Sequence, residues 1–472
     1  MLEMEKKLEN VYQSIKEKYK SNIVTNEILS DDEKRLDEYL SKIKKEADAL
    51  YKSNDNPYGI IEWDDYEDIQ PDLYEFSKQL PKGGDLHAHD HTMIPFDRFV
   101  EIIKENALIC INDDKQGVLY LKQSPNIPED ALEINEAIDK GLLSLDELTQ
   151  MLVLTDEDIT RGYWNKLEQL FSSTGDIYND VVIMEKIWEE GFESCYEKGI
   201  QLLEIRDYAV DDDLYNLLRD RTIREAYYRV KRRHPDFVVR LIGCTGKDDY
   251  TSIESAHSTL LSIIRTSEQV KDEFDPEHPQ DFIIGLDLVN EEDRSKQLSE
   301  FKDILMSDEI QNSGLKLFLH CGESLRNDND SVVDAYIYNS YRVGHALNLY
   351  RYPELMAEYR KKKIAIEVCL MSNYRLGYVK DLRLHPGLIY LINDIPITLC
   401  SDDGLYMSRA PLVDDFYSAI LCWNLDLSSI KMICRNSIEY SGLPAEEKEV
   451  LMTNWERKWN DFVSNQLKKI VC

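Results

Sequence analysis

The chain has 472 residues, 43% of them hydrophobic, which is enough to bury a sizeable core, so a disordered chain is not expected. Its 90 acidic residues outnumber the 56 basic ones, and the formal net charge of -34 repels polyanions. We therefore expect no nucleic-acid partner, although local cations in a pocket could still bind a single phosphate.

The amino-terminal residues form a charged amphipathic run without the apolar core of a secretion signal. No stretch of about 18 apolar residues is free of charge, so no membrane span is expected. Nine cysteines are scattered singly with no Cys-x-x-Cys pair, which favours reduced, buried thiols. These features predict a cytoplasmic protein.

Residues 1 to about 56 are rich in Lys, Glu and Asp, with Leu, Ile and Tyr at helical spacing, and Asn54 to Gly59 then breaks the pattern. We predict a helical arm over residues 1–75, ahead of one large domain over 76–472. The arm is interpreted either as a dimerisation element or as a solvated helical hairpin that packs on its own domain.

The segment from about 106 to 155 is polar and marked by Asp and Pro, as in Asn112-Asp113-Asp114 and Ser124-Pro125. This composition predicts an insertion after the first strand and helix rather than a new domain.

Short apolar, β-branched runs alternate with helical stretches through the rest of the chain, which is typical of buried parallel strands. Eight such runs predict a (β/α)₈ barrel with an amino-terminal helical extension. A doubly wound sheet is the alternative, but no glycine-rich phosphate loop follows the first strand. The expected strands are Gly84–His89, Leu202–Tyr208, Phe237–Cys244, Phe282–Val289, Leu315–His320, Tyr341–His345, Ile364–Cys369 and Ile395–Cys400.

Potential metal ligands stand at the ends of these strands, where barrel enzymes place their chemistry. His87 and His89 flank one residue of the first strand, so both imidazoles project from the same face. His320 closes the fifth strand and Asp402 the eighth, which completes a set of three His and one carboxylate with room for water. An isolated His-x-His pair is more often structural, but the combination in barrel order predicts a hydrolytic zinc site.

Other polar groups follow the same strand ends. Glu323 comes three residues after His320 and is a candidate proton donor, the alternative being an ordinary loop Glu. His345 is interpreted either as orienting the attacking hydroxide or as a core His bonded to backbone. Asp403 can face the substrate while Asp402 faces the metal, if Gly404 supplies a turn there.

Motifs along most of the chain resemble the adenosine deaminase family, and more closely its adenosine deaminase growth factor branch. The resemblance implies a zinc-dependent hydrolase, with one zinc per chain, that converts adenosine or 2′-deoxyadenosine to inosine or 2′-deoxyinosine and ammonia. The segments that carry it are Leu80–Asp90, Trp164–Arg206, Ile366–Cys369, Ser372-Asn373, Asp381–Pro386, Asn436–Ile438 and Trp455–Phe462.

The roles that the resemblance implies agree with those argued from the residues. Glu323 would protonate ring N1, His345 would position the attacking hydroxide, and Asp402 would also take a proton from the attacking water. Asp403 would hold purine N7, and the backbone N–H of Asn290 would reach ring N3, since Asn tolerates unusual backbone angles. The metal ligands would be His87, His89, His320 and Asp402.

Departures from the family pattern surround the substrate. His91-Thr92 stands where the family commonly has Asp-Gly. Because an acid repels phosphate and a His can donate to it, a 5′-nucleotide such as AMP or dAMP is the alternative substrate. Otherwise His91 points into the barrel wall or solvent. Trp164 resembles an aromatic that covers the sugar, or else packs the insertion. Asn290, Ala346 and Gly404 also replace family residues.

Two further hypotheses belong to other classes. The protein could be a binding or signalling protein that keeps the fold without turnover, or a zinc amidohydrolase for another purine or a pterin amine. Branch members are typically secreted and dimerise through an amino-terminal helical region. Because the arm is present here without a secretion signal, we expect a cytoplasmic homodimer that binds a small purine nucleoside or nucleotide.

Overall fold

The computed structural model describes residues 2–18, 23, 25–53, 71–112, 117–155, 158, 163–248, 251–407 and 410–471. The helix-breaking segment expected at 54–59 and part of the polar run at 112–114 lie outside these ranges. No helix among the described residues is both long and apolar enough to cross a membrane.

Eight parallel strands form a barrel in which spatial neighbours follow one another along the chain. An isolated parallel bridge between Ala88 and Asp402 joins the first strand to the residues after the last and closes the ring. The predicted (β/α)₈ barrel is therefore confirmed and the doubly wound sheet is wrong. The strands are β1 (Gly83–His89), β5 (Ile200–Tyr208), β6 (Val238–Gly246), β9 (Ile283–Val289), β10 (Lys316–Cys321), β11 (Arg342–His345), β12 (Ala365–Val368) and β13 (Ile397–Leu399).

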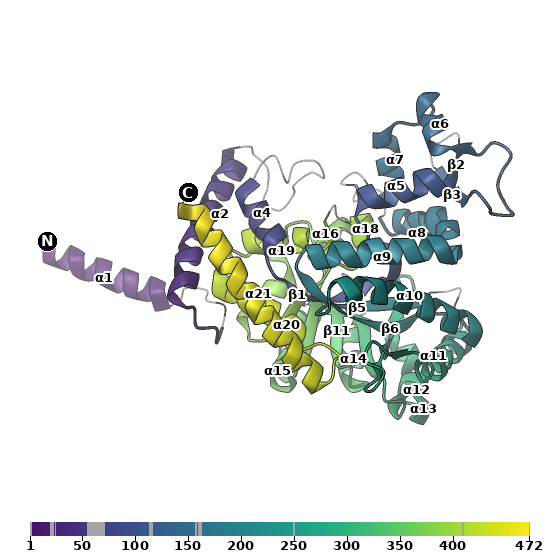
Figure 1. Cartoon of the computed structure of the whole chain (residues 1–472). Helices are drawn as coiled ribbons and strands as arrows, with labels where there is room; N and C mark the ends of the chain where they lie inside the picture. Colours follow the sequence, from purple (N-terminus) through teal and green to yellow (C-terminus); the bar gives the residue numbers. More distant parts are fainter. Residues whose placement is uncertain are drawn as a thin grey trace.

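The strands read as nearly continuous apolar runs because both of their faces are covered, by the barrel interior and by helices around it. Figure 1 shows these helices packed around the strands. They are α9 (Val181–Glu197), α10 (Asp213–Arg233), α11 (Ile253–Ser267), α12 (Lys302–Leu305), α13 (Asp308–Gln311), α14 (Ser331–Ile337), α15 (Pro353–Lys362), α16 (Leu370–Arg375), α17 (Pro386–Ile392), α18 (Gly404–Met407), α19 (Val413–Cys422), α20 (Leu427–Glu439) and α21 (Ala445–Val471).

The amino-terminal arm holds α1 (Leu2–Lys18), α2 (Asp31–Ser53) and α4 (Pro71–Gln79). Helix α2 packs beside α21, the last helix of the chain, and buries Leu36 and Leu40 completely. Trp459 of α21 donates a hydrogen bond to Glu33 of α2 at 2.7 Å. Helix α1 projects away from the barrel (Figure 1).

The region after β1 carries a small antiparallel sheet in the order β3-β2-β4. It lies on the opposite side of the barrel from α1 in Figure 1. Whether it folds as an insertion over about 106–155 stays a prediction. Its elements are α5 (Phe96–Asn106), β2 (Ala107–Ile111), β3 (Gly117–Leu121), β4 (Leu132–Glu133), α6 (Ile134–Asp139), α7 (Leu145–Leu152) and α8 (Tyr163–Thr174).

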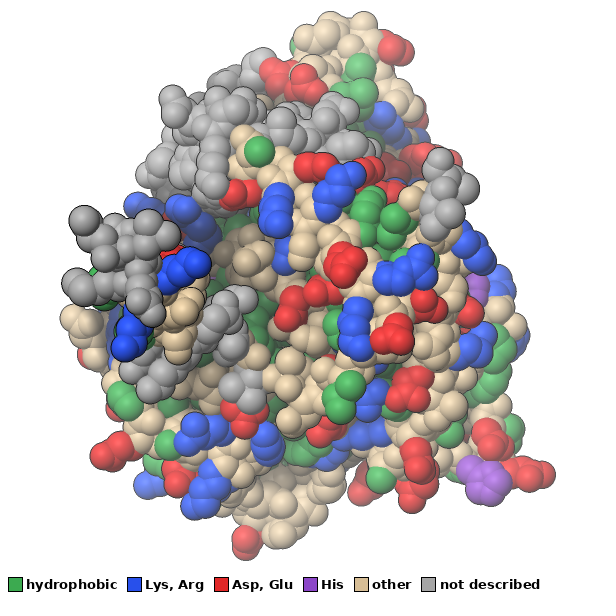
Figure 2. Space-filling view, turned by 90° about the vertical axis from the view of Figure 1, so that its left-hand side faces the viewer, with side chains coloured by type: hydrophobic (Ala, Val, Ile, Leu, Met, Phe, Trp, Pro, Cys, Tyr) green, Lys and Arg blue, Asp and Glu red, His purple; other side chains and the backbone are tan. Residues whose placement is uncertain are grey.

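The remaining elements are short. A two-stranded ribbon pairs β7 (Lys271–Asp272) with β8 (Gln280–Asp281). On the face in Figure 2, acidic and basic side chains of the described residues are intermingled, with no broad area of either sign. The 3₁₀ turns are η1 (Asp90–Met93), η3 (Gly175–Asn179), η4 (Leu298–Phe301), η5 (Leu349–Arg351) and η6 (Leu382–Leu384).

Candidate active site

A cavity of about 340 Å³ lies at the carboxyl ends of the barrel strands, a size that suits a small ligand. It contains every residue predicted for the site except His87, which lies fully buried behind it. The lining residues are His89, Asp90, His91, Trp164, Phe171, Arg206, Tyr208, Val289, Asn290, His320, Glu323, His345, Leu376, Asp402 and Asp403.

Unusual backbone conformations aim several of these side chains. Asn290, His345 and Asp402 have φ angles of 84°, 59° and 57°, in the left-handed region that non-glycine residues rarely adopt. The expectation that Gly404 supplies the turn at the end of the last strand is wrong, because Asp402 itself makes it and Gly404 begins α18. Such strain persists only where the surroundings enforce it, and it concentrates at functional sites.

Three imidazoles and one carboxylate converge at the base of the cavity. His89 Nε2 lies 3.3 Å from His320 Nε2 and 3.2 Å from Asp402 Oδ1, and His87 Nε2 lies 3.5 Å from the same oxygen. The ligand atoms of these four residues all lie within 4.8 Å of one another. His345 and Cys369 form a second such group with His87 and Asp402. Cys369 was not predicted as a site residue from the sequence.

These donor atoms fit a metal ion. The Nε2 atoms of His87 and His345 are buried and have no hydrogen-bond partner among the described residues. An unsatisfied buried polar atom costs about 1–3 kcal/mol, and a bound cation would remove that cost at His87. Three His nitrogens with one carboxylate oxygen is the donor set that zinc prefers among common metals.

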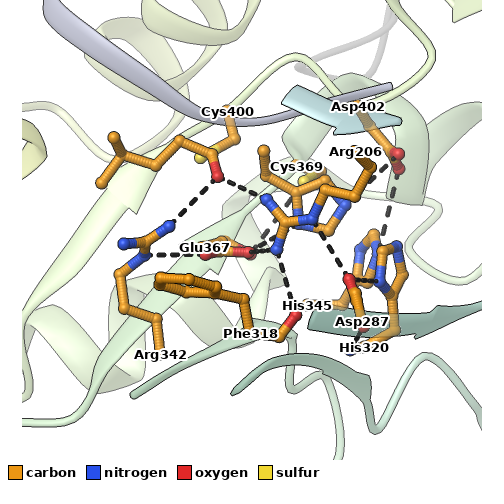
Figure 3. A network of polar contacts seen from close by, with 12 residues as sticks. Arg206, Asp287, Phe318, His320, Arg342, His345, Glu367, Cys369, Cys400 and Asp402 are labelled. Carbon is orange, nitrogen blue, oxygen red and sulfur yellow. Dashed lines mark hydrogen bonds and ion pairs between the residues drawn. The ribbon is translucent and has the colours of Figure 1, made fainter. Parts of the chain in front are cut away.

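The outer ring nitrogens of two of these histidines are held by carboxylates. His87 Nδ1 lies 2.7 Å from Glu367 Oε2, and His320 Nδ1 lies 2.6 Å from Asp287 Oδ2. A carboxylate at Nδ1 fixes the proton there and leaves Nε2 free to bind a metal. Arg206 bridges the two acids, at 2.6 Å from Glu367 and 3.1 Å from Asp287 (Figure 3).

A second arginine extends this network inside the barrel. Arg342 donates to Glu367 Oε1 at 2.8 Å and to Glu204 Oε2 at 2.6 Å, with every partner fully buried. Burial raises the pKa of Glu367, but the Arg206 and Arg342 guanidinium groups outweigh it and hold the pKa well below its usual range. Glu367 is therefore a permanent anion behind His87. This network was not predicted from the sequence. The pattern that could have indicated it is charged residues in the middle of apolar strand runs, as in Leu-Glu-Ile-Arg at 203–206.

Replacing Glu367 by Gln is expected to weaken metal binding about 10- to 100-fold, because His87 loses its anionic partner and two buried guanidinium groups lose a counter-charge. Titration of the metalated protein with a competing chelator measures the change. Asp272→Asn is the matched control, since Asp272 is a buried partner of Arg240, at 3.0 Å, in another part of the barrel. Equal metal affinity in Glu367→Gln and the wild type would contradict the assigned role.

Glu323 faces the same cavity from the turn after β10. Its side chain is buried, with Oε1 at 3.4 Å from Asn373 Nδ2 and 3.5 Å from His345 Nδ1. Burial, and then the nearby carboxylates of Asp402 and Glu292, raise the pKa of Glu323 well above its usual range. Glu323 can therefore keep a proton at neutral pH and donate it.

His345 and Asp403 also have shifted proton affinities. Burial lowers the pKa of His345 well below its usual value, so its imidazole is neutral. Its Nδ1 lies 3.2 Å from Asn373 Nδ2, and the oxygen of that amide lies 3.1 Å from His385 Nε2. Burial raises the pKa of Asp403 to about 7, although the nearby His89 opposes the shift. The sequence analysis assigned no role to Asn373 or His385.

Comparisons with known proteins agree with this chemistry. A family model described as adenosine deaminase matches residues 258–457. The chain is 28% identical to adenosine deaminase of Phlebotomus duboscqi, covering 92% of this chain and 87% of that protein. It is 29% identical to adenosine deaminase 2-A of Danio rerio, covering 84% and 82%. Both relatives are named adenosine deaminase, and the likeness to them extends over most of this chain.

The fold of this chain also resembles solved structures. The N6-methyl-AMP deaminase of Arabidopsis thaliana in its apo form superposes with a TM-score of 0.58 at 18% identity, covering 81% of this chain and 98% of that one. At this identity the likeness concerns the fold alone.

The substrate side of the cavity departs from the family pattern, and the structure places each departure. The side-chain amide of Asn290 bonds to the Asp248 carboxylate, and Trp164 Nε1 donates to the Tyr378 hydroxyl at 2.7 Å. Trp164 thus lines the cavity, and its indole N–H is used in the bond to Tyr378, which lies in the loop after α16.

His91 lines the cavity, but its ring is already in contact with neighbouring residues of the cavity wall. Its ring pairs with the neighbouring Asp90 carboxylate and lies against Tyr178, with ring centroids 3.4 Å apart. Asp90 in turn pairs with Arg219, which also bonds Asp207 at 2.7 Å. Arg206, the one arginine among the described lining residues, is committed to Glu367 and Asp287. No lining cation among them is left without an acidic partner.

Proposed function

We propose that the protein deaminates the adenine ring of adenosine and 2′-deoxyadenosine, releasing ammonia and leaving inosine or 2′-deoxyinosine. The observation that carries the proposal is a cluster of three His and one Asp at the base of a cavity that also holds a buried Glu323 able to keep its proton. The ligands of a single zinc ion would be His87, His89, His320 and Asp402. The bound ion would lower the pKa of water towards neutrality and so supply hydroxide.

Each remaining group has a task in the substitution at ring carbon C6. Glu323 donates its proton to ring N1, which makes C6 more electrophilic as the attacking oxygen arrives. His345, neutral because it is buried, orients the attacking oxygen and stabilises charge on it. Asp402 takes the proton from that oxygen and passes it to the amino group at C6, and the tetrahedral intermediate then collapses with loss of ammonia.

Two groups hold the purine. Ring N7 accepts hydrogen bonds, so Asp403 binds it in the protonated form, which a pKa of about 7 makes accessible near neutral pH. The left-handed backbone at Asn290 directs its N–H towards ring N3 in this scheme. Trp164 and His91 border the sugar, Trp164 by covering it and His91 at its 5′ end.

The cavity favours a nucleoside over a 5′-nucleotide. A phosphate binds where a cation is free to pair with it, whereas His91 here is paired with Asp90, and Arg219 and Arg206 are paired with acids. The cavity also presents the carboxylate of Asp402. We therefore expect adenosine and 2′-deoxyadenosine to be used with higher kcat/KM than AMP or dAMP.

Purified protein of measured metal content tests this expectation. Adenosine, 2′-deoxyadenosine, AMP, dAMP and ATP are each followed by ammonia release and by the adenine-to-hypoxanthine absorbance change. Higher kcat/KM for the monophosphates would mean that the 5′ side accepts phosphate despite its acids. No turnover of any of them with zinc bound would support a binding protein or a hydrolase for another amine.

We further propose that the protein is a homodimer joined through the arm, residues 1–75. Helix α1 projects from the barrel and exposes Leu8, Val11, Tyr12 and Ile15, which lie at helical spacing on one side. A second copy would cover this apolar face.

Light scattering is expected to give twice the chain mass of 55.2 kDa for the full chain, and the mass of one chain when residues 1–75 are removed. Leu8→Glu with Ile15→Glu in the full chain should also yield monomers, whereas the polar-face control Gln13→Ala should stay dimeric. A monomer both at full length and after truncation would contradict the proposal.

A cytoplasmic location is the last element of the proposal. The eight cysteines that the structure describes are all free thiols, as in a reducing compartment. Cell fractionation should recover the protein with cytosolic markers, and its accumulation in the culture medium would contradict this location.

A further inference from the structure

A buried acid next to the cavity has no part in the proposed chemistry. Glu292 lies shortly after the end of β9 and is only 3% exposed. Its Oε1 accepts from Lys247 Nζ at 3.2 Å, and Lys247 is itself 1% exposed and follows the end of β6. Its Oε2 accepts three hydrogen bonds, from Gly322 N at 3.0 Å, Asn329 Nδ2 at 2.8 Å and Ser331 Oγ at 3.0 Å.

These contacts hold the turn that carries Glu323. Gly322 has φ +69°, and a Cβ there would lie 2.5 Å from Asn348 Oδ1, so its backbone is seated closely against Asn348. On the other side of Glu323, the Ser324 hydroxyl donates to the Asp293 carboxylate. Two acids after β9 therefore form hydrogen bonds to the residues on either side of Glu323: Glu292 to Gly322 and Asp293 to Ser324.

The side chain of Glu323 does not fix its own position. Its polar contacts, 3.4 Å to Asn373 and 3.5 Å to His345, are longer than the 2.7–3.2 Å of ordinary hydrogen bonds. The bonds that Glu292 makes to its turn fall in the ordinary range. The placement of the Glu323 carboxyl in the cavity therefore depends on the backbone beneath it.

A buried ion pair is weak evidence for stability alone, since well-packed apolar residues of similar volume often serve as well. Here the charge has a local use, because the two oxygens of a carboxylate accept all four donors, whereas a glutamine has one acceptor oxygen with two lone pairs. Lys247 offsets the burial of that charge without reaching the cavity lining.

We propose that Glu292, paired with Lys247, is a positioning residue that sets the Glu323 turn for proton transfer to the substrate. The inference rests on the proposed function, in which Glu323 is the proton donor. Glu292 acts through the backbone of Gly322 and touches no reacting atom.

Glu292→Gln tests the proposal, because it keeps the size of the side chain and removes its charge and one acceptor. The expected result is a kcat lowered about 10- to 100-fold, the loss that a displacement of about 1 Å can cause. KM for adenosine and metal content should stay within about twofold of the wild type. Glu291→Gln is the matched control: Glu291 is the preceding residue, is also buried, and pairs instead with Arg294 at 2.8 Å.

A second readout needs no turnover. Amide hydrogen exchange, measured by mass spectrometry on peptides spanning residues 319–325, should be about tenfold faster in Glu292→Gln than in Glu291→Gln or the wild type. The Gly322 N–H loses its anionic acceptor, and its other acceptor, Ser331 Oγ at 2.7 Å, loses the carboxylate to which it donates. A wild type inactive on adenosine would overturn the proposed function and leave this exchange result to decide the role of Glu292 in holding the turn.

Two outcomes would overturn the inference itself: a kcat for Glu292→Gln within about twofold of that for Glu291→Gln, or equal exchange in the two variants. If Glu292→Gln fails to fold, Ser331→Ala takes its place, because it removes one donor to Glu292 Oε2 and the second acceptor of the Gly322 N–H. It should lower kcat about three- to tenfold at unchanged KM, and an unchanged kcat would count against the proposal.

Discussion

Glu323→Gln is expected to lower kcat for adenosine about 10²- to 10⁴-fold while the protein keeps its metal and its fold. Glutamine occupies nearly the same volume but has no acidic proton to give to ring N1. The cavity would still bind the purine through Asp403 and Asn290, so KM should change far less than kcat. Steady-state kinetics, with metal content and thermal unfolding measured on the same samples, provide the test.

Glu291→Gln again serves as the control, because Glu291 neighbours the cavity residue Asn290 but pairs with Arg294. Its kcat should stay within about twofold of the wild type. A Glu323→Gln variant that retains wild-type kcat with metal bound would remove Glu323 from the reaction and would favour a proton donor elsewhere in the cavity. If Glu323→Gln also lost its metal, chelator titration would be needed to tell whether Glu323 acts as the proton donor or supports metal binding.

The barrel was predictable because its strands are buried on both faces and therefore read as nearly continuous apolar runs, such as Ile283–Val289, in which Asp287 is the one charged residue. Each predicted strand matches an observed one, with bounds that differ by one or two residues. The convergence of His87, His320 and Asp402 followed from the same geometry, since the carboxyl ends of parallel barrel strands meet at one face.

What could not be predicted depends on contacts between strands distant in sequence. Nothing local distinguishes Glu367 as the partner of His87, because the two residues lie on β12 and β1 and meet only through closure of the barrel. The left-handed conformation of Asp402 was also missed, since glycine is the usual residue for such a backbone and Gly404 stood two residues away. In that position the strain is enforced by the bonds that Asp402 exchanges with the backbone of β1.

Removal of the metal is expected to abolish deamination and to destabilise the fold. Without a cation the cluster leaves His87 Nε2 buried and unsatisfied, and the water in the cavity keeps its ordinary pKa. A metal held at about 100 times its Kd would contribute about 2.7 kcal/mol to the free energy of unfolding, and the metal-free protein should lose that amount. Chelation followed by dialysis, with activity and denaturant unfolding measured before and after zinc is restored, tests both effects.

His89→Ala should reproduce the metal-free behaviour even in excess zinc, because His89 Nε2 lies at the centre of the cluster, within 3.3 Å of both His320 and Asp402. His234→Ala is the matched control, since His234 pairs with Glu193 on the outer helices and should leave metal content and kcat unchanged. If rigorously metal-free protein turned adenosine over at the wild-type rate, the cluster of His and Asp would have to be structural, and the attacking water would have to be activated by His345 or Asp402 alone. His345 Nε2 lies 3.9 Å from Oδ2 of the ligand Asp402, so either group could reach a water molecule at the cluster. The chelation experiment therefore distinguishes a site that requires the cation for turnover from one that binds it without using it.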